Sequence, residues 1–208
     1  MTGKKLTGWL PGFSLSEEGQ RQAEAVAKNL EQIKIDAFYS SPLERCAETA
    51  AVIAEPRGKK VEIIQDVGEI RYGDWQGRSL AALARTKGWR EMNAKRSDFR
   101  FPNGETPREA QTRAVAAIEK IAAAHKDQTV AVVSHADLIR LLVAAYVGLS
   151  LELYNRMSVQ PASVTALALG ERPRLLALNA GTDLSWLNRD RADGRKQKAQ
   201  KSDGKRSR

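Results

Sequence analysis

The sequence predicts a three-layer α/β/α sandwich around a mainly parallel β-sheet. Two features of its 208 residues carry this prediction. Short, strand-like apolar runs alternate with longer segments whose apolar residues recur at helical spacing. One run, 129–133 (TVAVV), is continuously apolar and rich in β-branched residues, which is typical of a parallel strand covered on both faces. The length suits one domain of ordinary size.

The sequence of the first third of the chain predicts a helix, a strand, a second helix and a second strand. Ser16 can cap the first helix, because a serine side chain accepts a hydrogen bond from a free N–H group at a helix start. Pro42 stands where a second helix can begin, since proline is well suited to the first helical position. The expected elements are a helix over 16–32, a strand over 37–39, a helix from Pro42 to about Ala54 and a strand over 61–64.

The stretch 65–77 is polar and punctuated by glycine, which predicts a loop of unusual length. Further on, Thr106, Pro107 and Glu109 have the spacing of a capping box, which marks a helix start. The expected elements are a helix from 106 to about His125, the strand 129–133, a helix from about Asp137 to Val147, and closing strands at 163–169 and 174–178.

Composition excludes several classes of protein. Hydrophobic residues make up 42% and charged residues 28%, which is globular rather than disordered or fibrous. No run approaches the roughly 20 apolar residues of a membrane-spanning helix, and no apolar run follows the N-terminal lysines as in a secretory signal. The single cysteine, Cys46, excludes a disulfide framework and a cysteine-rich zinc site. We therefore expect a cytoplasmic protein without membrane association.

Much of the net charge of +9 lies at the C-terminus. Residues 189–208 hold nine Lys or Arg and three Asp, a net charge of +6, and no apolar residue larger than alanine. Such a segment cannot bury surface, so the sequence predicts a domain over 1–188 followed by a disordered basic tail over 189–208. The tail could contact nucleic acid electrostatically, but no aromatic residues interleave its charges, which favours a solvated tail.

Three polar residues follow strands of the predicted sheet. His135 comes directly after the most apolar strand, Arg45 lies in the first turn after the 37–39 strand, and Glu69 is in the loop after the 61–64 strand. Parallel sheets bind ligands at the carboxyl ends of their strands, so these side chains are candidates for one site. An arginine that grips phosphate oxygens, a histidine and a carboxylic acid suit phosphoryl transfer.

Each candidate also has an ordinary structural explanation. A lone arginine on a helix is usually at the surface, and Glu69 could be a solvated loop acid. His135 is the strongest candidate, because an imidazole directly after a buried strand must find a partner. His125 ends a helix, and we interpret it as a residue that complements the helix dipole. Cys46 is interpreted as a small, packed hydrophobic residue.

Five segments, in order along the chain, resemble motifs of the histidine phosphatase superfamily, which has the phosphoglycerate mutase-like fold. They resemble its L-[ST]-x-x-G-x-x-Q-A helix start, its SSPL-x-R…ETA segment, its E-x-x-x-G-x-W-x-G loop, its P-x-G-E-[ST] motif and its VSH motif. The matching residues are 15–23 (LSEEGQRQA), 40–50 (SSPLERCAETA), 68–77 (GEIRYGDWQG), 101–106 (FPNGET) and 132–135 (VVSH).

The resemblance implies a role for each candidate. Members transfer a phosphoryl group to a histidine and then hydrolyse it or pass it on, without a metal or other cofactor. Arg45 would bind the phosphate, His135 would hydrogen-bond the transferred group, and Glu69 would protonate the leaving group. Thr7 and Gly8 resemble a Thr-Gly-Trp segment of cofactor-dependent mutases that touches substrate, although the loop around Glu69 resembles phosphatases instead.

The family's nucleophile is the histidine of an R-H-G-x-[TS] motif on its first strand, and the 208 residues contain no Arg-His-Gly. The first strand and the nucleophile are therefore expected to be missing from this sequence. One explanation is that the true protein extends upstream of Met1, which we favour because loss of a central strand would expose the backbone of its neighbours. The other is a pseudophosphatase that binds an anionic ligand without turnover.

The resulting hypothesis is a phosphomonoesterase that acts on a small phosphorylated metabolite, with the 208-residue chain inactive unless it is extended upstream. A rival hypothesis is a protein that associates with nucleic acid through its basic tail. Specificity in this fold resides between the glutamate loop and the next helix, here about 78–100. Its basic residues could attract a second anionic group or form a solvated lid; they are Arg85, Lys87, Arg90, Lys95, Arg96 and Arg100.

Overall fold

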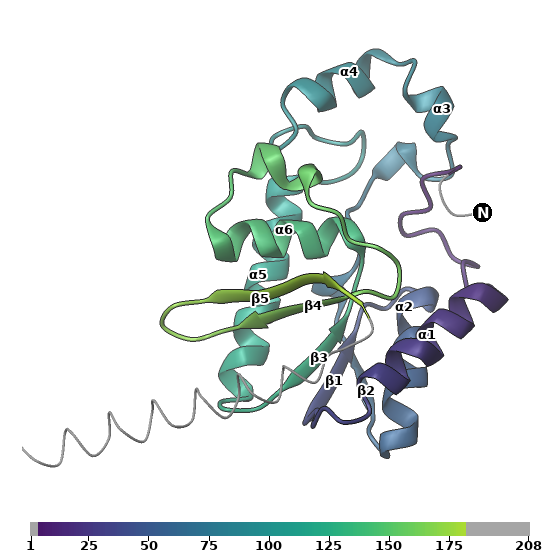
Figure 1. Ribbon diagram of the computed structural model, residues 1–208. Helices are drawn as coiled ribbons and strands as arrows, with labels where there is room; N and C mark the ends of the chain where they lie inside the picture. The colour runs from purple at the N-terminus through teal and green to yellow at the C-terminus, as the bar shows by residue number, and fades with distance from the viewer. Residues whose placement is uncertain (1–3, 182–208) are drawn as a thin grey trace, which may run out of the picture.

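The computed structural model describes residues 4–181. Its main sheet has three parallel strands in the order β2-β1-β3, each joined to the next along the chain by helical segments. This is the α/β architecture that the sequence predicts, and Figure 1 shows the sheet between two groups of helices. The strands are β1 (Ala37–Ser40), β2 (Val61–Ile63) and β3 (Val130–Val133).

The two faces of the sheet bury alternate residues of its strands. Phe38 and Ala131 pack into a cluster with residues of the first two helices, whereas Tyr39 and Val132 pack into a larger cluster with residues of the last two. This alternation is the period of two expected for strands between helical layers. The helices are α1 (Glu17–Asn29) and α2 (Glu44–Ala54) on one face, and α5 (Pro107–Ala124) and α6 (Ala136–Val147) on the other.

Two predicted helix starts are confirmed. The Ser16 side chain accepts a hydrogen bond from the Gly19 N–H, and Thr106 and Glu109 form the reciprocal capping box at the start of α5. The second helix begins two residues later than expected, at Glu44. Its start is shifted because the Ser41 side chain accepts the Leu43 N–H and the backbone of Leu43 is extended.

Strand β3 is less covered than its sequence predicts. All four of its residues are half-buried, although the apolar run predicts a strand covered on both faces. In the described part of the chain, β3 pairs with β1 on one edge and has no strand on the other. The carbonyls of Thr129 and Val133 accept hydrogen bonds from Asp36 and Ser41, next to β1. Backbone groups alternate in direction along a strand, so those of the intervening residues 130 and 132 face the unpaired edge.

The last two strands form a separate antiparallel hairpin and do not join the main sheet. Val164 and Ala180 of this hairpin pack against the cluster that α1 and α2 share with Phe38, and the second hairpin strand contacts α6. The hairpin thus covers part of the molecule beside β3 (Figure 1). Its strands are β4 (Val164–Ala168) and β5 (Arg174–Ala180).

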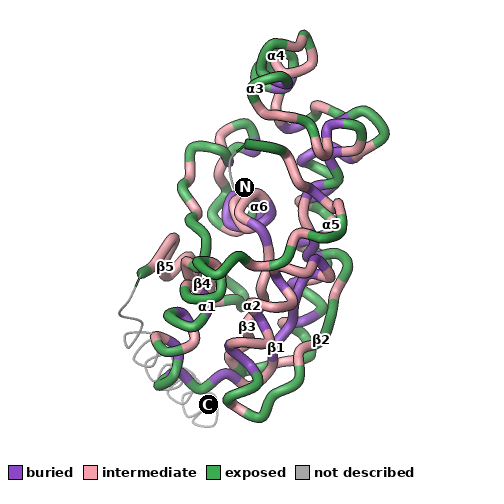
Figure 2. The backbone as a smooth tube through the Cα atoms, turned by 90° about the vertical axis from the view of Figure 1, so that its right-hand side faces the viewer, coloured by how far each residue is buried: buried purple, intermediate pink, exposed green. Residues whose placement is uncertain are grey.

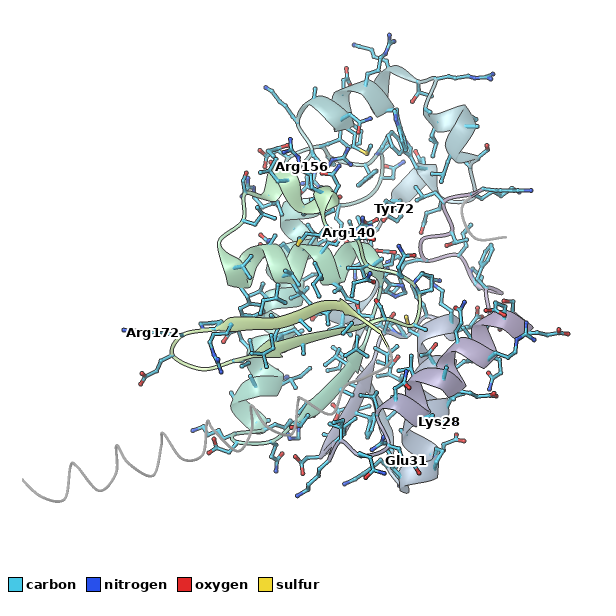
Figure 3. The ribbon with its side chains drawn as sticks, in the orientation of Figure 1. Lys28, Glu31, Tyr72, Arg140, Arg156 and Arg172 are labelled. Carbon is cyan, nitrogen blue, oxygen red and sulfur yellow. The ribbon has the colours of Figure 1, made fainter. Side chains whose placement is uncertain are left out.

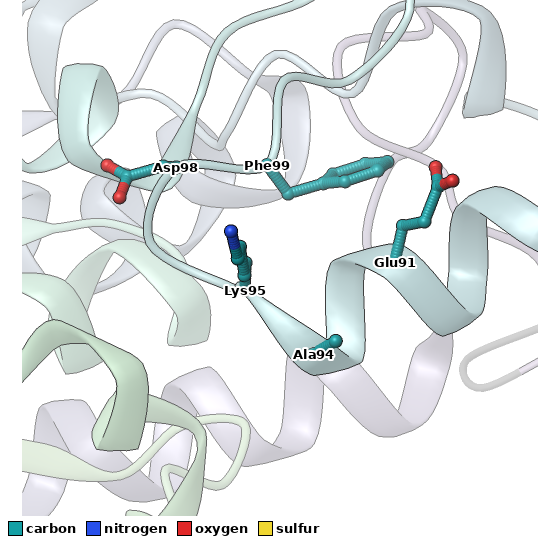
Figure 4. A pocket seen from close by; sticks show the side chains of 5 residues that line it. All are labelled: Glu91, Ala94, Lys95, Asp98 and Phe99. Atoms are coloured by element: carbon teal, nitrogen blue, oxygen red, sulfur yellow. The ribbon is translucent and has the colours of Figure 1, made fainter.

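The segment 78–100, for which the sequence predicts no helix or strand, contains α3 (Leu80–Leu83) and α4 (Lys87–Ala94). Aromatic stacking anchors it, because the rings of Trp75 and Trp89 are 6.0 Å apart and nearly parallel. Figure 2 shows this segment mostly exposed at one end of the molecule. A pocket beside α4 is lined by Glu91, Ala94, Lys95, Asp98 and Phe99 (Figure 4).

Short 3-10 turns punctuate the predicted loop 65–77, at Gln65–Val67 and Gly73–Trp75, and another spans Leu151–Arg156. Between residues 4 and 181, no helix has the length and apolar character needed to cross a membrane. The predicted basic tail 189–208, and residues 182–188 of the predicted domain, lie outside the described residues.

Candidate active site

The carboxyl ends of β1 and β3 bring two of the three predicted site residues into contact. Arg45 is in the first turn of α2, just after β1, and His135 is the residue before α6, just after β3. Because β1 and β3 are parallel neighbours, the two side chains meet at the same edge of the sheet. Nη2 of Arg45 lies 3.1 Å from Nδ1 of His135.

His135 is buried, and both nitrogens of its ring are engaged. A guanidinium can only donate, so Nδ1 accepts from Arg45, and the ring proton resides on Nε2, which donates to Oγ of Ser41 over 2.8 Å. Burial, followed by the positive charges of Arg45 and Arg113, lowers the pKa of His135 to about 3. The imidazole is therefore neutral at physiological pH.

Glu69 completes the group, with Oε2 of its carboxyl 3.9 Å from Nδ1 of His135. Its other oxygen accepts the backbone N–H of Ile70 over 2.9 Å. Burial, followed by the negative charge of Asp137, raises the pKa of Glu69 to about 8. At pH 7 a mostly protonated carboxyl therefore faces a neutral imidazole, so the two are not an ion pair. A protonated acid in this position can donate a proton to a nearby oxygen.

The loop that carries Glu69 is held by a half-buried arginine. Arg113 on α5 donates to the carbonyls of Asp66, Gly68 and Glu69 over 2.7, 3.0 and 2.8 Å. The same guanidinium binds both carboxylate oxygens of Glu105, at 3.0 and 2.6 Å. Arg113 therefore ties α5 to the backbone of the loop and positions the Glu69 carboxyl.

A strap of the chain before α1, residues 4–15, crosses beside the site. Arg45 Nη2 donates to the Gly8 carbonyl over 3.1 Å, so Gly8 lies against Arg45, and Thr7 is half-buried next to it. Gly8 has a φ of +53°, and a Cβ atom there would lie 2.4 Å from the side-chain oxygen of Gln76. The strap thus requires glycine at this position.

The guanidinium of Arg45 keeps unused hydrogen-bonding capacity. Within residues 4–181, its Nη1 atom is buried and has no hydrogen-bond partner. Since His135 is neutral and Glu69 is mostly protonated, Arg45 supplies the net charge of this trio, which is positive. The arrangement suits an anion with several oxygen acceptors, such as a phosphoryl group. No group of three or more His, Cys, Asp or Glu in the described residues converges as a metal site requires.

Several residues beyond the predicted candidates support this site. Ser41 binds His135, Arg113 holds the Glu69 loop, and the Trp9 indole N–H donates to the Glu69 carbonyl over 2.6 Å. Ser41 and Trp9 lie inside the family-like motifs of the sequence, but nothing in the sequence singles out Arg113. Cys46 is buried, with its sulfur 3.5 Å from Nε2 of His135, and burial raises the pKa of its thiol to about 12, so it stays protonated.

A second polar network adjoins Glu69. The Tyr72 hydroxyl donates to one carboxylate oxygen of Asp137 over 2.6 Å, and Arg140 binds the other at 2.6 Å. Figure 3 labels Tyr72 and Arg140 in this region, above the hairpin. After burial, the negative charge of Asp137 is the next cause that raises the pKa of Glu69, and it favours the protonated form of that acid.

Residues 2–180 match the histidine phosphatase superfamily (branch 1). The chain is 30% identical to phosphoserine phosphatase 1 of Hydrogenobacter thermophilus over 166 residues, 78% of each chain. It is also 30% identical to the 2,3-bisphosphoglycerate-dependent phosphoglycerate mutase of Thermoplasma acidophilum over 176 residues, 84% of each chain. Its fold matches a mycobacterial glucosyl-3-phosphoglycerate phosphatase with a TM-score of 0.79 and 27% identity, covering 87% of this chain and 93% of that one. The chain therefore belongs to the histidine phosphatase superfamily, as the motifs around Arg45, Glu69 and His135 imply.

Proposed function

We propose that this site binds the phosphoryl group of a small phosphate monoester and belongs to a phosphomonoesterase that works through a phosphohistidine. The observation that carries the proposal is the buried Nη1 of Arg45, which lies beside His135 and a protonated Glu69 and has no partner among residues 4–181. The similarity to phosphoserine and glucosyl-3-phosphoglycerate phosphatases supports a small phosphorylated substrate.

Each residue has a distinct part in this proposal. Arg45 donates to phosphate oxygens, and the dianion favours protonation of His135 at Nδ1, so that this nitrogen changes from acceptor to donor. The P–O bond to the leaving group breaks as the phosphoryl group bonds to a histidine nitrogen, and Glu69 gives its proton to the leaving oxygen. A water molecule then attacks the phosphorus as the P–N bond breaks. The water gives a proton to Glu69, inorganic phosphate leaves, and the histidine is free again.

His135 is proposed to bind the phosphoryl group and not to attack it. Both of its ring nitrogens are engaged, by Arg45 and Ser41, so neither presents a free lone pair. The other histidine, His125, closes α5 and binds the Tyr39 hydroxyl at 2.8 Å, so it does not join the site. We therefore propose that the 208-residue form binds phosphate without hydrolysing esters, and that turnover needs the histidine of an Arg-His-Gly segment.

Two measurements test this proposal. Inorganic phosphate or vanadate is titrated into the 208-residue protein and its Arg45→Met variant, and we expect binding that falls at least tenfold in the variant. Hydrolysis of p-nitrophenyl phosphate is then measured for the same protein and for a form that carries an Arg-His-Gly segment upstream of Met1. We expect turnover in the second form alone.

The outcomes separate binding from catalysis. If the 208-residue protein binds no phosphate, the proposed site is wrong. If it hydrolyses the ester and loses that activity in His135→Ala, then His135 is the nucleophile and its proposed binding role is wrong. Phosphate binding without turnover in either form would support the pseudophosphatase hypothesis instead.

A further inference from the structure

Trp9 lies between two residues of the candidate site. It directly follows Gly8 in the strap, and the Gly8 carbonyl accepts a hydrogen bond from Nη2 of Arg45 over 3.1 Å. The Trp9 indole N–H donates to the Glu69 carbonyl over 2.6 Å. Two consecutive residues of the strap, whose Cα atoms are about 3.8 Å apart, therefore contact the residue proposed to bind phosphate and the residue proposed to donate a proton.

The half-buried side chain of Trp9 is itself held on several sides. Its ring packs so closely against Gly68 that a Cβ atom at that position would collide with it. The backbone N–H of Trp9 donates to Oε1 of Gln76 over 2.6 Å. The Arg71 guanidinium carbon lies 5.3 Å from the ring centre, within the range of a cation–π interaction. The indole is thus held in one orientation against the loop that carries Glu69.

The Glu69 carbonyl accepts two hydrogen bonds, which come from different parts of the chain. One donor is Nη2 of Arg113 on α5, at 2.8 Å, and the other is the indole of Trp9 on the strap. Arg113 also donates to two further carbonyls of the loop, so it attaches the loop to α5 independently of the strap. Trp9 instead relates the position of Glu69 to the strap, and through the strap to Arg45.

Trp9 carries no charge, so it can act on the Glu69 carboxyl only through position and solvation. That carboxyl is 14% exposed and faces the neutral ring of His135 at 3.9 Å. The charged groups that act on it belong to α2 and α6; they are Arg45, Asp137 and Arg140. Burial is the largest cause that raises the pKa of Glu69, and a substitution at Trp9 would change this burial while leaving the three charged side chains in the protein.

We propose that Trp9 is a positioning residue that couples phosphate binding at Arg45 to the placement of the Glu69 carboxyl. The two terminal nitrogens of a guanidinium belong to one planar group. A phosphate that binds the unpartnered Nη1 of Arg45 therefore also moves Nη2, which holds the Gly8 carbonyl. The displacement passes from Gly8 to Trp9 and on to the loop. The inference rests on the proposed function, because it takes phosphate as the ligand of Arg45.

The experiment compares Trp9→Phe with a matched control, Trp89→Phe, in the 208-residue protein. Both substitutions replace an indole by a smaller ring without an N–H group, but Trp89 lies on α4 and stacks on Trp75. The pKa of the Glu69 carboxyl is measured by ¹³C NMR in wild type and in both variants without ligand. The indole ¹H–¹⁵N signals and their hydrogen exchange are measured in wild type, with and without inorganic phosphate, and in ligand-free Arg45→Met.

We expect Glu69 of wild type to titrate at about pH 8. In Trp9→Phe its pKa should fall by about one pH unit or more, because water reaches the carboxyl of the loosened loop. Trp89→Phe should leave this pKa as in wild type. Phosphate should shift the Trp9 indole signal and not that of Trp89. In Arg45→Met the Trp9 indole should exchange about tenfold faster or more, because Gly8 loses its donor.

An unchanged pKa of Glu69 in Trp9→Phe, or an equal fall in Trp89→Phe, overturns the inference. So does a Trp9 indole signal that ignores bound phosphate. If Trp9→Phe does not fold, the indole exchange in Arg45→Met decides, and an unaltered rate there contradicts the coupling. If wild type binds no phosphate, the proposed function is wrong and the coupling to phosphate is wrong with it, even where Trp9→Phe still shifts the titration of Glu69.

Discussion

Nη2 of Arg45 donates a hydrogen bond to Nδ1 of His135 over 3.1 Å, and this contact fixes the chemistry of the imidazole. It leaves Nδ1 without a proton and directs the ring proton to Nε2, where Ser41 accepts it. It also places a permanent positive charge against a buried ring. Burial, and after it the charge of Arg45, thus keep the histidine neutral.

The first prediction follows from this contact. In ¹⁵N NMR spectra of the protein, His135 should appear as the neutral tautomer with its proton on Nε2 throughout pH 5–8, because its pKa is lowered to about 3. Phosphate should shift the Nδ1 signal towards the protonated form. An Arg45→Met variant should titrate at a higher pH, since the positive charge is gone. A wild-type His135 that titrates near the ordinary pKa of about 6.5 contradicts this account.

The meeting of Arg45 and His135 at one edge of the sheet is the part of the candidate site that the sequence predicts well. His135 and Arg45 each follow a strand of a parallel sheet, and neighbouring parallel strands end at one edge, so strand positions alone bring them together. Glu69 is harder to place, because its position depends on a loop whose shape is set by Arg113 from a distant helix. Such long-range hydrogen bonds leave no periodic pattern in the sequence.

The second prediction concerns Glu69 and the pH dependence of stability. The folded protein keeps a proton on Glu69 up to about pH 8, whereas the unfolded chain releases it near pH 4.5. Folding is therefore favoured by this proton below pH 4.5, and the advantage is lost as the pH rises towards 8, with a slope of about 1.4 kcal/mol per pH unit. Glu69→Gln should remove that slope.

The free energy of unfolding is measured by urea titration of both proteins at pH 5, 6, 7 and 8. The variant should gain stability relative to wild type as the pH rises across this series. Parallel pH profiles for the two proteins would show that Glu69 titrates normally, and the proton-donor role would then lose its physical basis.

The third prediction concerns the clamp formed by Arg113. Arg113→Met removes the partner of the buried Glu105 carboxylate and three hydrogen bonds to loop carbonyls. Breaking a buried ion pair from one side costs about 3–5 kcal/mol, so the variant should be destabilised by that order in urea. The double variant Arg113→Met/Glu105→Gln should be less destabilised than the sum of the two single variants, because it leaves no buried charge unpaired. Strictly additive effects would rule out direct coupling.

The burial of strand β3 differs from what its local sequence predicts. Its apolar, β-branched residues have the composition of a strand covered on both faces. How far the β3 side chains are buried depends on the elements that flank the strand. Strands β4 and β5 pair with each other and not with β3. The half-buried side chains of β3 follow from that pairing, which no property of residues 130–133 records.

The fourth prediction tests this unpaired edge through hydrogen exchange. The N–H groups of Ala131 and Val133 face β1, whereas those of Val130 and Val132 face the edge that has no strand among the described residues. In native-state exchange followed by NMR, the amides of Val130 and Val132 should therefore exchange much faster than those of Ala131 and Val133. Alternation along one short strand cannot arise from global unfolding, which exposes all four amides equally. Slow exchange at all four positions in dilute protein would mean that the edge is covered in solution, and a concentration series would then show whether a second copy of the chain covers it.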